Sequence, residues 1–161
     1  HPTELMPAPS GELYVTDGYR NSRVHRFNKD GELIQSWGQP GKTAPGEFHL
    51  PHTMAITPDG TLYVSDRANR RVQIFSPDGK YKGQWTGMGG PNDMALDKNG
   101  VFYLGEQATD TTKPAISVRD GNGAVLARWE VEPTHGMGID GLGNIYVGIT
   151  KGGRVDKYVR V

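Results

Sequence analysis

Short runs in which apolar and polar residues alternate recur along the chain at a nearly constant interval. The clearest run has the pattern G-x-apolar-Tyr-apolar, and it begins at Gly11, Gly60, Gly100 and Gly143, at intervals of 40 to 49 residues. Alternation with a period of two residues is typical of β-strands that bury one face. A phrase that returns at this interval indicates tandem copies of one supersecondary unit.

Each complete unit predicts four short strands. The first strands are expected at 3–7, 52–56, 92–96 and 135–139, the second at 11–15, 60–64, 100–104 and 143–147, and the third at 23–27, 71–75, 116–119 and 154–158. A fourth strand ends at Trp37, Trp85 and Trp129. Asp-Gly and Asn-Gly turns between such runs are typical of hairpins. Antiparallel four-stranded sheets at this period are typical of propeller blades, so the fold class is all-β and a β-propeller. A β-sandwich is the alternative, but it does not require one phrase to recur four times.

The repeats predict a single propeller domain over residues 1–161, with blades at about 1–50, 51–90, 91–133 and 134–161. The last unit supplies about three strands, and the first begins directly on a first strand. Because folds normally avoid an open sheet edge, we expect either that N-terminal blades are missing from this chain or that the ring closes by association with another copy.

Composition narrows the classes of function. The chain has 23 glycines and 11 prolines, but they lie at regular intervals between the apolar runs, where turns are needed. The 18 basic and 18 acidic residues balance, so no basic surface for nucleic acid or for a membrane is indicated. The absence of cysteine excludes disulfides and thiolate metal ligands.

Candidate site residues follow from the propeller expectation. First strands line the central channel, and the residue after each leading proline is expected at one mouth of it; these residues are Thr3, His52, Asn92 and, one residue out of register, His135. Imidazole is a common zinc ligand, but a catalytic zinc normally takes three protein ligands. The alternative is that both histidines cap backbone groups in the channel or bind water.

Two further side chains lie close to the junction between a second and a third strand. Tyr19 stands in the run D-G-Y-R-N-S-R, and a turn has no need of its hydroxyl. Arg71 begins a third strand, and the residues alone predict a structural role for it, as the partner of an aspartate such as Asp66 across two blades. The Asp and Asn residues of these runs are themselves common turn formers.

The residues quoted above resemble a known family. The units look like NHL repeats, and D-G-Y-R-N-S-R-V-H-R-F, P-G-E-F-H-L-P-H-T-M-A-I and S-D-R-A-N-R-R-V-Q-I-F resemble the peptidyl-α-hydroxyglycine α-amidating lyases. The resemblance runs along the whole chain and is strongest over 13–75. It implies a six-bladed ring of which this chain is the last four blades. It also implies zinc held by three histidines, a structural calcium, and cleavage of peptidyl-α-hydroxyglycine to glyoxylate and a peptide amide.

The resemblance also assigns roles to residues. It places Tyr19 on the catalytic tyrosine, His52 and His135 on the second and third zinc histidines, and Arg71 on an arginine near the mouth. The chain departs from the family at Gly136, where the family has a carboxylate, and this weakens the case for calcium. The family's first zinc histidine and its catalytic arginine lie in blades that this chain does not contain.

Two functions therefore stay open, and with them the question of whether the chain is an enzyme. One is a metal-dependent carbon–nitrogen lyase of the amidating type, completed by further blades or by a partner. The other is a non-catalytic NHL propeller that binds a protein, peptide or carbohydrate at its channel mouth. In either case the expected ligand is a small molecule or peptide. The resemblance favours a secreted or periplasmic location.

Overall fold

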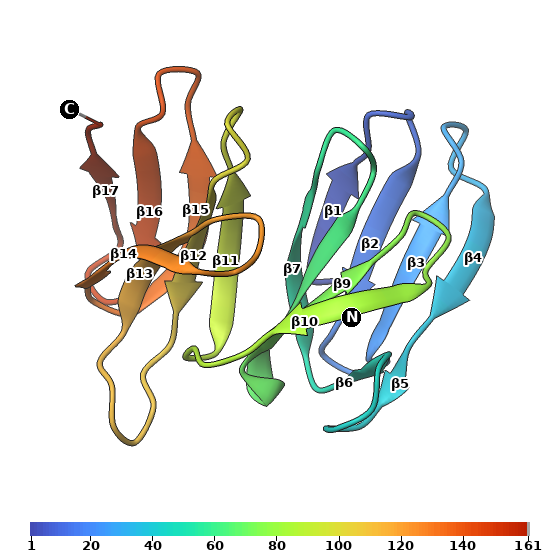
Figure 1. Ribbon diagram of the computed structural model, residues 1–161, viewed down its shortest axis with the longest axis horizontal. Coiled ribbons are helices and arrows are strands. Elements are labelled where there is room, and N and C mark those ends of the chain that lie inside the picture. Colours follow the sequence, from blue (N-terminus) through green and yellow to red (C-terminus); the bar gives the residue numbers. More distant parts are fainter. Residues whose placement is uncertain (161) are drawn as a thin grey trace. The chain divides into compact units, whose positions relative to one another are not determined.

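A computed structural model describes residues 1–160 as β-strands joined by short turns, with one turn of 3-10 helix, η1 (Arg67–Asn69). The chain divides into two compact units, residues 1–87 and the residues from 88 onward, and each is described by itself. Figure 1 labels the strands of both units and colours them along the chain from blue to red.

The first unit contains two four-stranded antiparallel sheets. The first sheet has the order β1-β2-β3-β4 and the second the order β10-β9-β8-β7. Their bounds are β1 (Glu4–Pro7), β2 (Leu13–Asp17), β3 (Arg23–Phe27), β4 (Leu33–Trp37), β7 (Pro51–Ile56), β8 (Leu62–Asp66), β9 (Arg71–Phe75) and β10 (Tyr81–Trp85). The connection between the sheets carries a short parallel pair, β5 (Gln39–Pro40) and β6 (Glu47–Phe48).

The second unit contains one four-stranded sheet and one sheet with three strands among the described residues. The order is β11-β12-β13-β14 in the former and β15-β16-β17 in the latter. Their bounds are β11 (Pro91–Leu96), β12 (Phe102–Glu106), β13 (Ala115–Arg119), β14 (Val125–Glu130), β15 (Thr134–Ile139), β16 (Ile145–Ile149) and β17 (Arg154–Tyr158).

The all-β fold of repeated four-stranded units is thus confirmed, with every sheet in chain order. The expected Asp-Gly turns are present too: Gly31 and Gly79 have φ of 84° and 76°, in the left-handed region that favours glycine. The six-bladed ring and the blade limits stay predictions.

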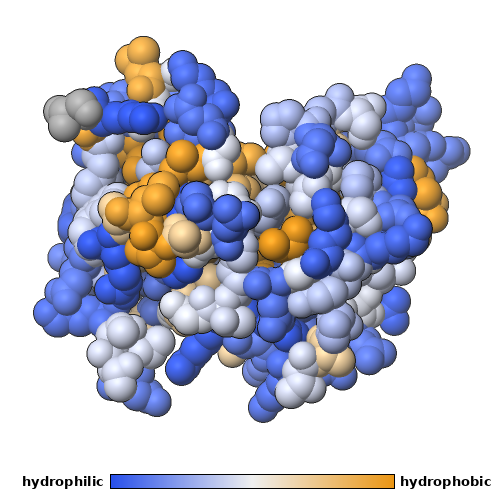
Figure 2. All heavy atoms as spheres, viewed as in Figure 1, coloured by the Kyte–Doolittle hydropathy of each residue, from blue (hydrophilic) through white to orange (hydrophobic). Residues whose placement is uncertain are grey.

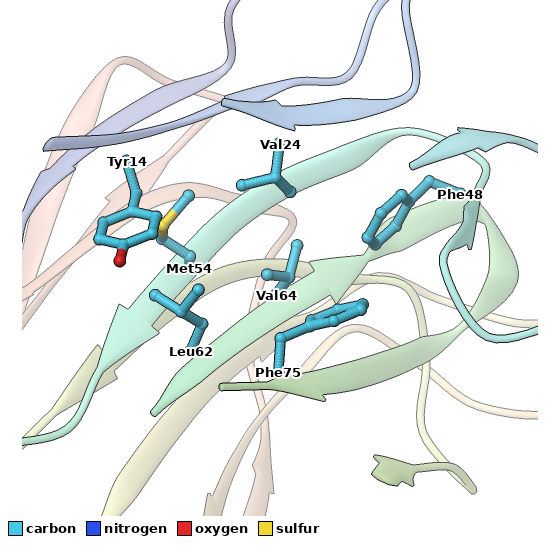
Figure 3. Packing of buried hydrophobic residues seen from close by; sticks show 7 residues of the cluster. All are labelled: Tyr14, Val24, Phe48, Met54, Leu62, Val64 and Phe75. Carbon is cyan, nitrogen blue, oxygen red and sulfur yellow. The ribbon is translucent and has the colours of Figure 1, made fainter. Parts of the chain in front are cut away.

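Alternation along the strands produces the core between the two sheets of the first unit. Figure 3 shows Val24 from the first sheet above Met54, Leu62, Val64 and Phe75 from the second. Tyr14 and Phe48 complete this buried cluster, and Trp37 packs against it. In the second unit, Ile116, Ile145, Val147 and Ile149 belong to the equivalent cluster. These cores fix neighbouring sheets face to face and so fix the loops at their ends.

The hydropathy of the surface is consistent with the low apolar content of the chain. The face in Figure 2 is mostly hydrophilic, with several apolar patches. Within residues 1–160, no helix is long and apolar enough to cross a membrane.

Candidate functional site at the mouth of the first unit

Tyr19 and His52 meet across two neighbouring sheets. Tyr19 lies in the loop after β2, and His52 is the second residue of β7. The Tyr19 hydroxyl is 3.3 Å from His52 Nε2, and the two rings meet edge to face with centroids 5.9 Å apart. Tyr19 is 51% exposed, whereas His52 is only 5% exposed. The pair therefore presents a phenol to solvent with an imidazole behind it.

Gly18 allows this meeting because the two backbones approach closely there. A Cβ at Gly18 would lie 2.0 Å from the Pro51 carbonyl oxygen, a distance that no side chain tolerates. The loop that carries Tyr19 therefore rests directly on the start of β7. Any larger residue at position 18 would move the Tyr19 loop away from His52.

A β-bulge in β7 contains His52 and sets the direction of its side chain. The register of β7 on β8 runs regularly from Ile56 back to Met54, and is then interrupted between Met54 and Pro51. Bulges bend a strand and redirect a side chain, and they are frequent next to active sites. The Thr53 amide, displaced from the ladder, donates to Ser65 Oγ at 2.9 Å.

His135 occupies the corresponding position in the second unit. The pairing of β15 with β16 is interrupted between Thr134 and Met137, so His135 also lies in a bulge. Gly136 has a φ of 113°, which gives a conformational reason for glycine where the resembled family has a carboxylate. His135 is exposed, and it belongs to a different compact unit from His52.

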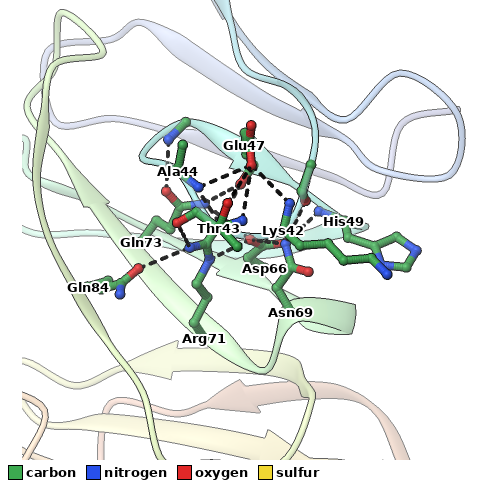
Figure 4. Close-up of polar contacts among 12 residues, drawn as sticks. Lys42, Thr43, Ala44, Glu47, His49, Asp66, Asn69, Arg71, Gln73 and Gln84 are labelled. Atoms are coloured by element: carbon green, nitrogen blue, oxygen red, sulfur yellow. Dashed lines mark hydrogen bonds and ion pairs between the residues drawn. The ribbon is translucent and has the colours of Figure 1, made fainter.

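Arg71 lies in a buried network with Asp66 and Gln84 (Figure 4). Its Nε donates to Asp66 Oδ2 at 2.8 Å, and its two amino groups donate to Gln84 Oε1 and to the carbonyls of Thr43, Ala44 and Glu47. All five N–H groups of a guanidinium thus have acceptors. Arg71 fastens the 43–47 loop to the second sheet, and its catalytic role stays a prediction.

The expected pairing of Arg71 with Asp66 is confirmed, but its placement between blades is wrong. Asp66 and Arg71 are directly opposite each other on β8 and β9 of one sheet. Asp66 is fully buried and also accepts from Asn69, Gln73 and the His49 amide. Burial raises the pKa of the Asp66 carboxyl above its ordinary value, and the hydrogen bonds from Asn69, His49 and Arg71 work against the rise.

The donor set for zinc is incomplete in the described part of the chain. Among residues 1–160, no three or more His, Asp or Glu side chains form a group that could hold a metal ion. The bulge at His52 brings one imidazole and one phenol together, short of the three protein ligands of a catalytic zinc. These residues do not by themselves fit the metal, so we derive no chemical step through it.

Comparison with known proteins gives a family description and several relatives. The NHL repeat matches residues 48–75, which include His52 and Arg71. Peptidyl-glycine alpha-amidating monooxygenase B of Xenopus laevis is 30% identical over 178 residues, covering 98% of this chain and 20% of the relative. A probable peptidyl-alpha-hydroxyglycine alpha-amidating lyase of Caenorhabditis elegans is 34% identical over 108 residues, covering 66% of this chain and 31% of the relative.

The likeness to solved structures concerns the fold. Virginiamycin B lyase from Staphylococcus aureus matches with a TM-score of 0.71 at 15% identity, over 96% of this chain and 54% of that one. The chain spans less than a third of the length of both relatives named above. The chain therefore contains an NHL repeat within a β-propeller fold, and it is similar in sequence to the peptidyl-α-hydroxyglycine α-amidating lyases.

Proposed function

We propose that this chain contributes the tyrosine–histidine pair of a lyase that cleaves peptidyl-α-hydroxyglycine to a peptide amide and glyoxylate. The observation that carries the proposal is the contact of the Tyr19 hydroxyl with His52 Nε2. Similarity to the Xenopus laevis monooxygenase B, whose match covers 98% of the chain, and to the probable amidating lyase of Caenorhabditis elegans supports it.

The chemistry needs one proton to be taken and one to be given. A base removes the proton of the α-hydroxyl, the carbon–oxygen double bond of glyoxylate forms, and the carbon–nitrogen bond breaks. The leaving nitrogen then takes a proton and becomes the amide. Positioned side chains contribute to such transfers when they lie within hydrogen-bond reach of each other and of the substrate.

Tyr19 and His52 fit the two ends of this transfer. Tyr19 is 51% exposed, so a peptide substrate can reach it from solvent, and its hydroxyl contacts the imidazole of the buried His52. An imidazole that can both accept and donate a proton can exchange one with a phenol at 3.3 Å. We assign the contact with substrate to Tyr19 and the second proton position to His52.

The proposal does not depend on zinc, because the described residues do not form a complete set of zinc ligands. That His52 and His135 bind zinc stays a prediction from the resemblance. Calcium stays a prediction from the resemblance.

The proposal predicts turnover of a minimal substrate. Incubation of the chain with N-benzoyl-α-hydroxyglycine, with and without added Zn²⁺, is expected to release benzamide and glyoxylate in equal amounts, measured by liquid chromatography. Saturable binding of the substrate without product would contradict the lyase and favour the non-catalytic, ligand-binding propeller.

A further inference from the structure

The bulge that aims His52 is held by side chains from the neighbouring sheet. The Glu4 carboxylate, which carries a formal charge, makes two of the contacts that hold this bulge. We propose that Glu4 is a positioning residue of the Tyr19–His52 site. The importance of this role for catalysis rests on the proposed function. Glu4 lies on β1, an edge strand of the first sheet, and β1 packs beside β7 of the second.

Glu4 contacts the two residues that follow His52. Its Oε2 accepts from the Thr53 hydroxyl at 2.8 Å and from the Met54 amide at 2.5 Å. Thr53 and Met54 are buried, so these donors are shielded from water. Hydrogen bonds to an ionised carboxylate are stronger than those between neutral groups. One carboxylate oxygen thus fixes the backbone at the point where the β7 register is interrupted.

Two threonines of the first sheet hold the other side of the bulge. The Thr3 hydroxyl donates to the Pro51 carbonyl at 2.9 Å, and the Thr16 hydroxyl lies 3.4 Å from the His52 carbonyl. Together with Glu4, they hold His52 and the residues on both sides of it along the chain. The bulge conformation is therefore specified by the neighbouring sheet as well as by its own partner strand β8.

The consequence for the site follows from how its two members are supported. Tyr19 is placed by the contact of Gly18 with Pro51, and His52 by the bulge that Glu4 fixes. If the bulge relaxes, the imidazole turns relative to the phenol while the rest of both sheets keeps its core. A displacement of about 1 Å in a catalytic group can cost about 100-fold in rate.

The test compares Glu4→Ala with Glu4→Gln in the 161-residue chain. The Gln amide oxygen can still accept from Thr53 and Met54, whereas Ala cannot. Long-range ¹H–¹⁵N NMR spectra report the imidazole signals of His52, assigned with His52→Ala, and Tyr19→Phe gives their positions without the phenol contact. We expect Glu4→Ala to move these signals toward the Tyr19→Phe positions and Glu4→Gln to leave them near those of the parent.

Unchanged His52 signals in a folded Glu4→Ala chain would overturn the proposal. Thermal unfolding shows whether that variant folds. If it does not, Glu4→Asp, whose shorter side chain cannot reach both donors, takes its place with the same expectation. The readout requires no turnover, so an inactive parent chain would contradict the proposed lyase and leave the role of Glu4 in placing His52 to be decided by the spectra.

Discussion

Replacing Tyr19 with phenylalanine is expected to lower kcat/KM for N-benzoyl-α-hydroxyglycine by about 10²- to 10⁴-fold, the range that a positioned acid or base contributes. The ring and its edge-to-face packing on His52 are kept, and only the hydroxyl that contacts Nε2 is lost. Since Tyr19 is 51% exposed, the free energy of unfolding should change little. The measurement is steady-state release of glyoxylate, with urea unfolding of the same preparation.

Tyr81→Phe is the matched control for this experiment. Tyr81 lies at the start of β10 in the same unit, is 38% exposed, and also packs its ring on a neighbour, Phe75. It should keep parental activity. Equal activity of Tyr19→Phe and the parent chain would remove Tyr19 from the mechanism.

Replacing Arg71 with methionine is expected to destabilise the first unit by about 3–5 kcal/mol, the cost of leaving a buried charge without its partner. Asp66 would keep its other donors but lose the guanidinium, and the Thr43 carbonyl would lose its donor, whereas the Ala44 and Glu47 carbonyls would each keep another. Urea unfolding followed by tryptophan fluorescence, to which Trp37 contributes, gives the free energy.

Arg23→Met is the control, because Arg23 faces Asp17 in the same register on β2 and β3 but is exposed. Its loss should cost about 0.5 kcal/mol or less, as for exposed side chains away from special features. Adding Asp66→Asn to Arg71→Met should recover part of the stability, because the uncompensated charge is removed. If Arg71→Met costs no more than Arg23→Met, the buried network does not have the role assigned to it.

The fold was predictable because each level of the sequence agrees with the next. The alternation at Leu13–Val15 and its three counterparts marks strands, glycines such as Gly31 and Gly79 supply the positive φ of the turns, and a tryptophan closes three units. Local preference and global repeat point to the same answer, which is the condition under which such reasoning succeeds.

The candidate site was predictable only in part. The repeat placed His52 at the start of a strand, and the resemblance singled out Tyr19. The spacing of the two residues along the chain did not predict that they would touch. Their contact depends on a bulge and on a close backbone approach at Gly18, and both are tertiary features. Glu4 carried no signal, because a single glutamate in a strand is ordinarily a solvated side chain. Arg71 was expected at the mouth, and the structure shows its donors committed to a buried loop.

The most direct test of the tyrosine–histidine pair is a double-mutant cycle on kcat/KM for N-benzoyl-α-hydroxyglycine, with Tyr19→Phe, His52→Ala and both together. Residues that act as a unit show strongly non-additive losses. The account predicts that the double variant is about as slow as the slower single variant. Losses that multiply in the double variant, or a parent chain that releases no glyoxylate, would contradict it.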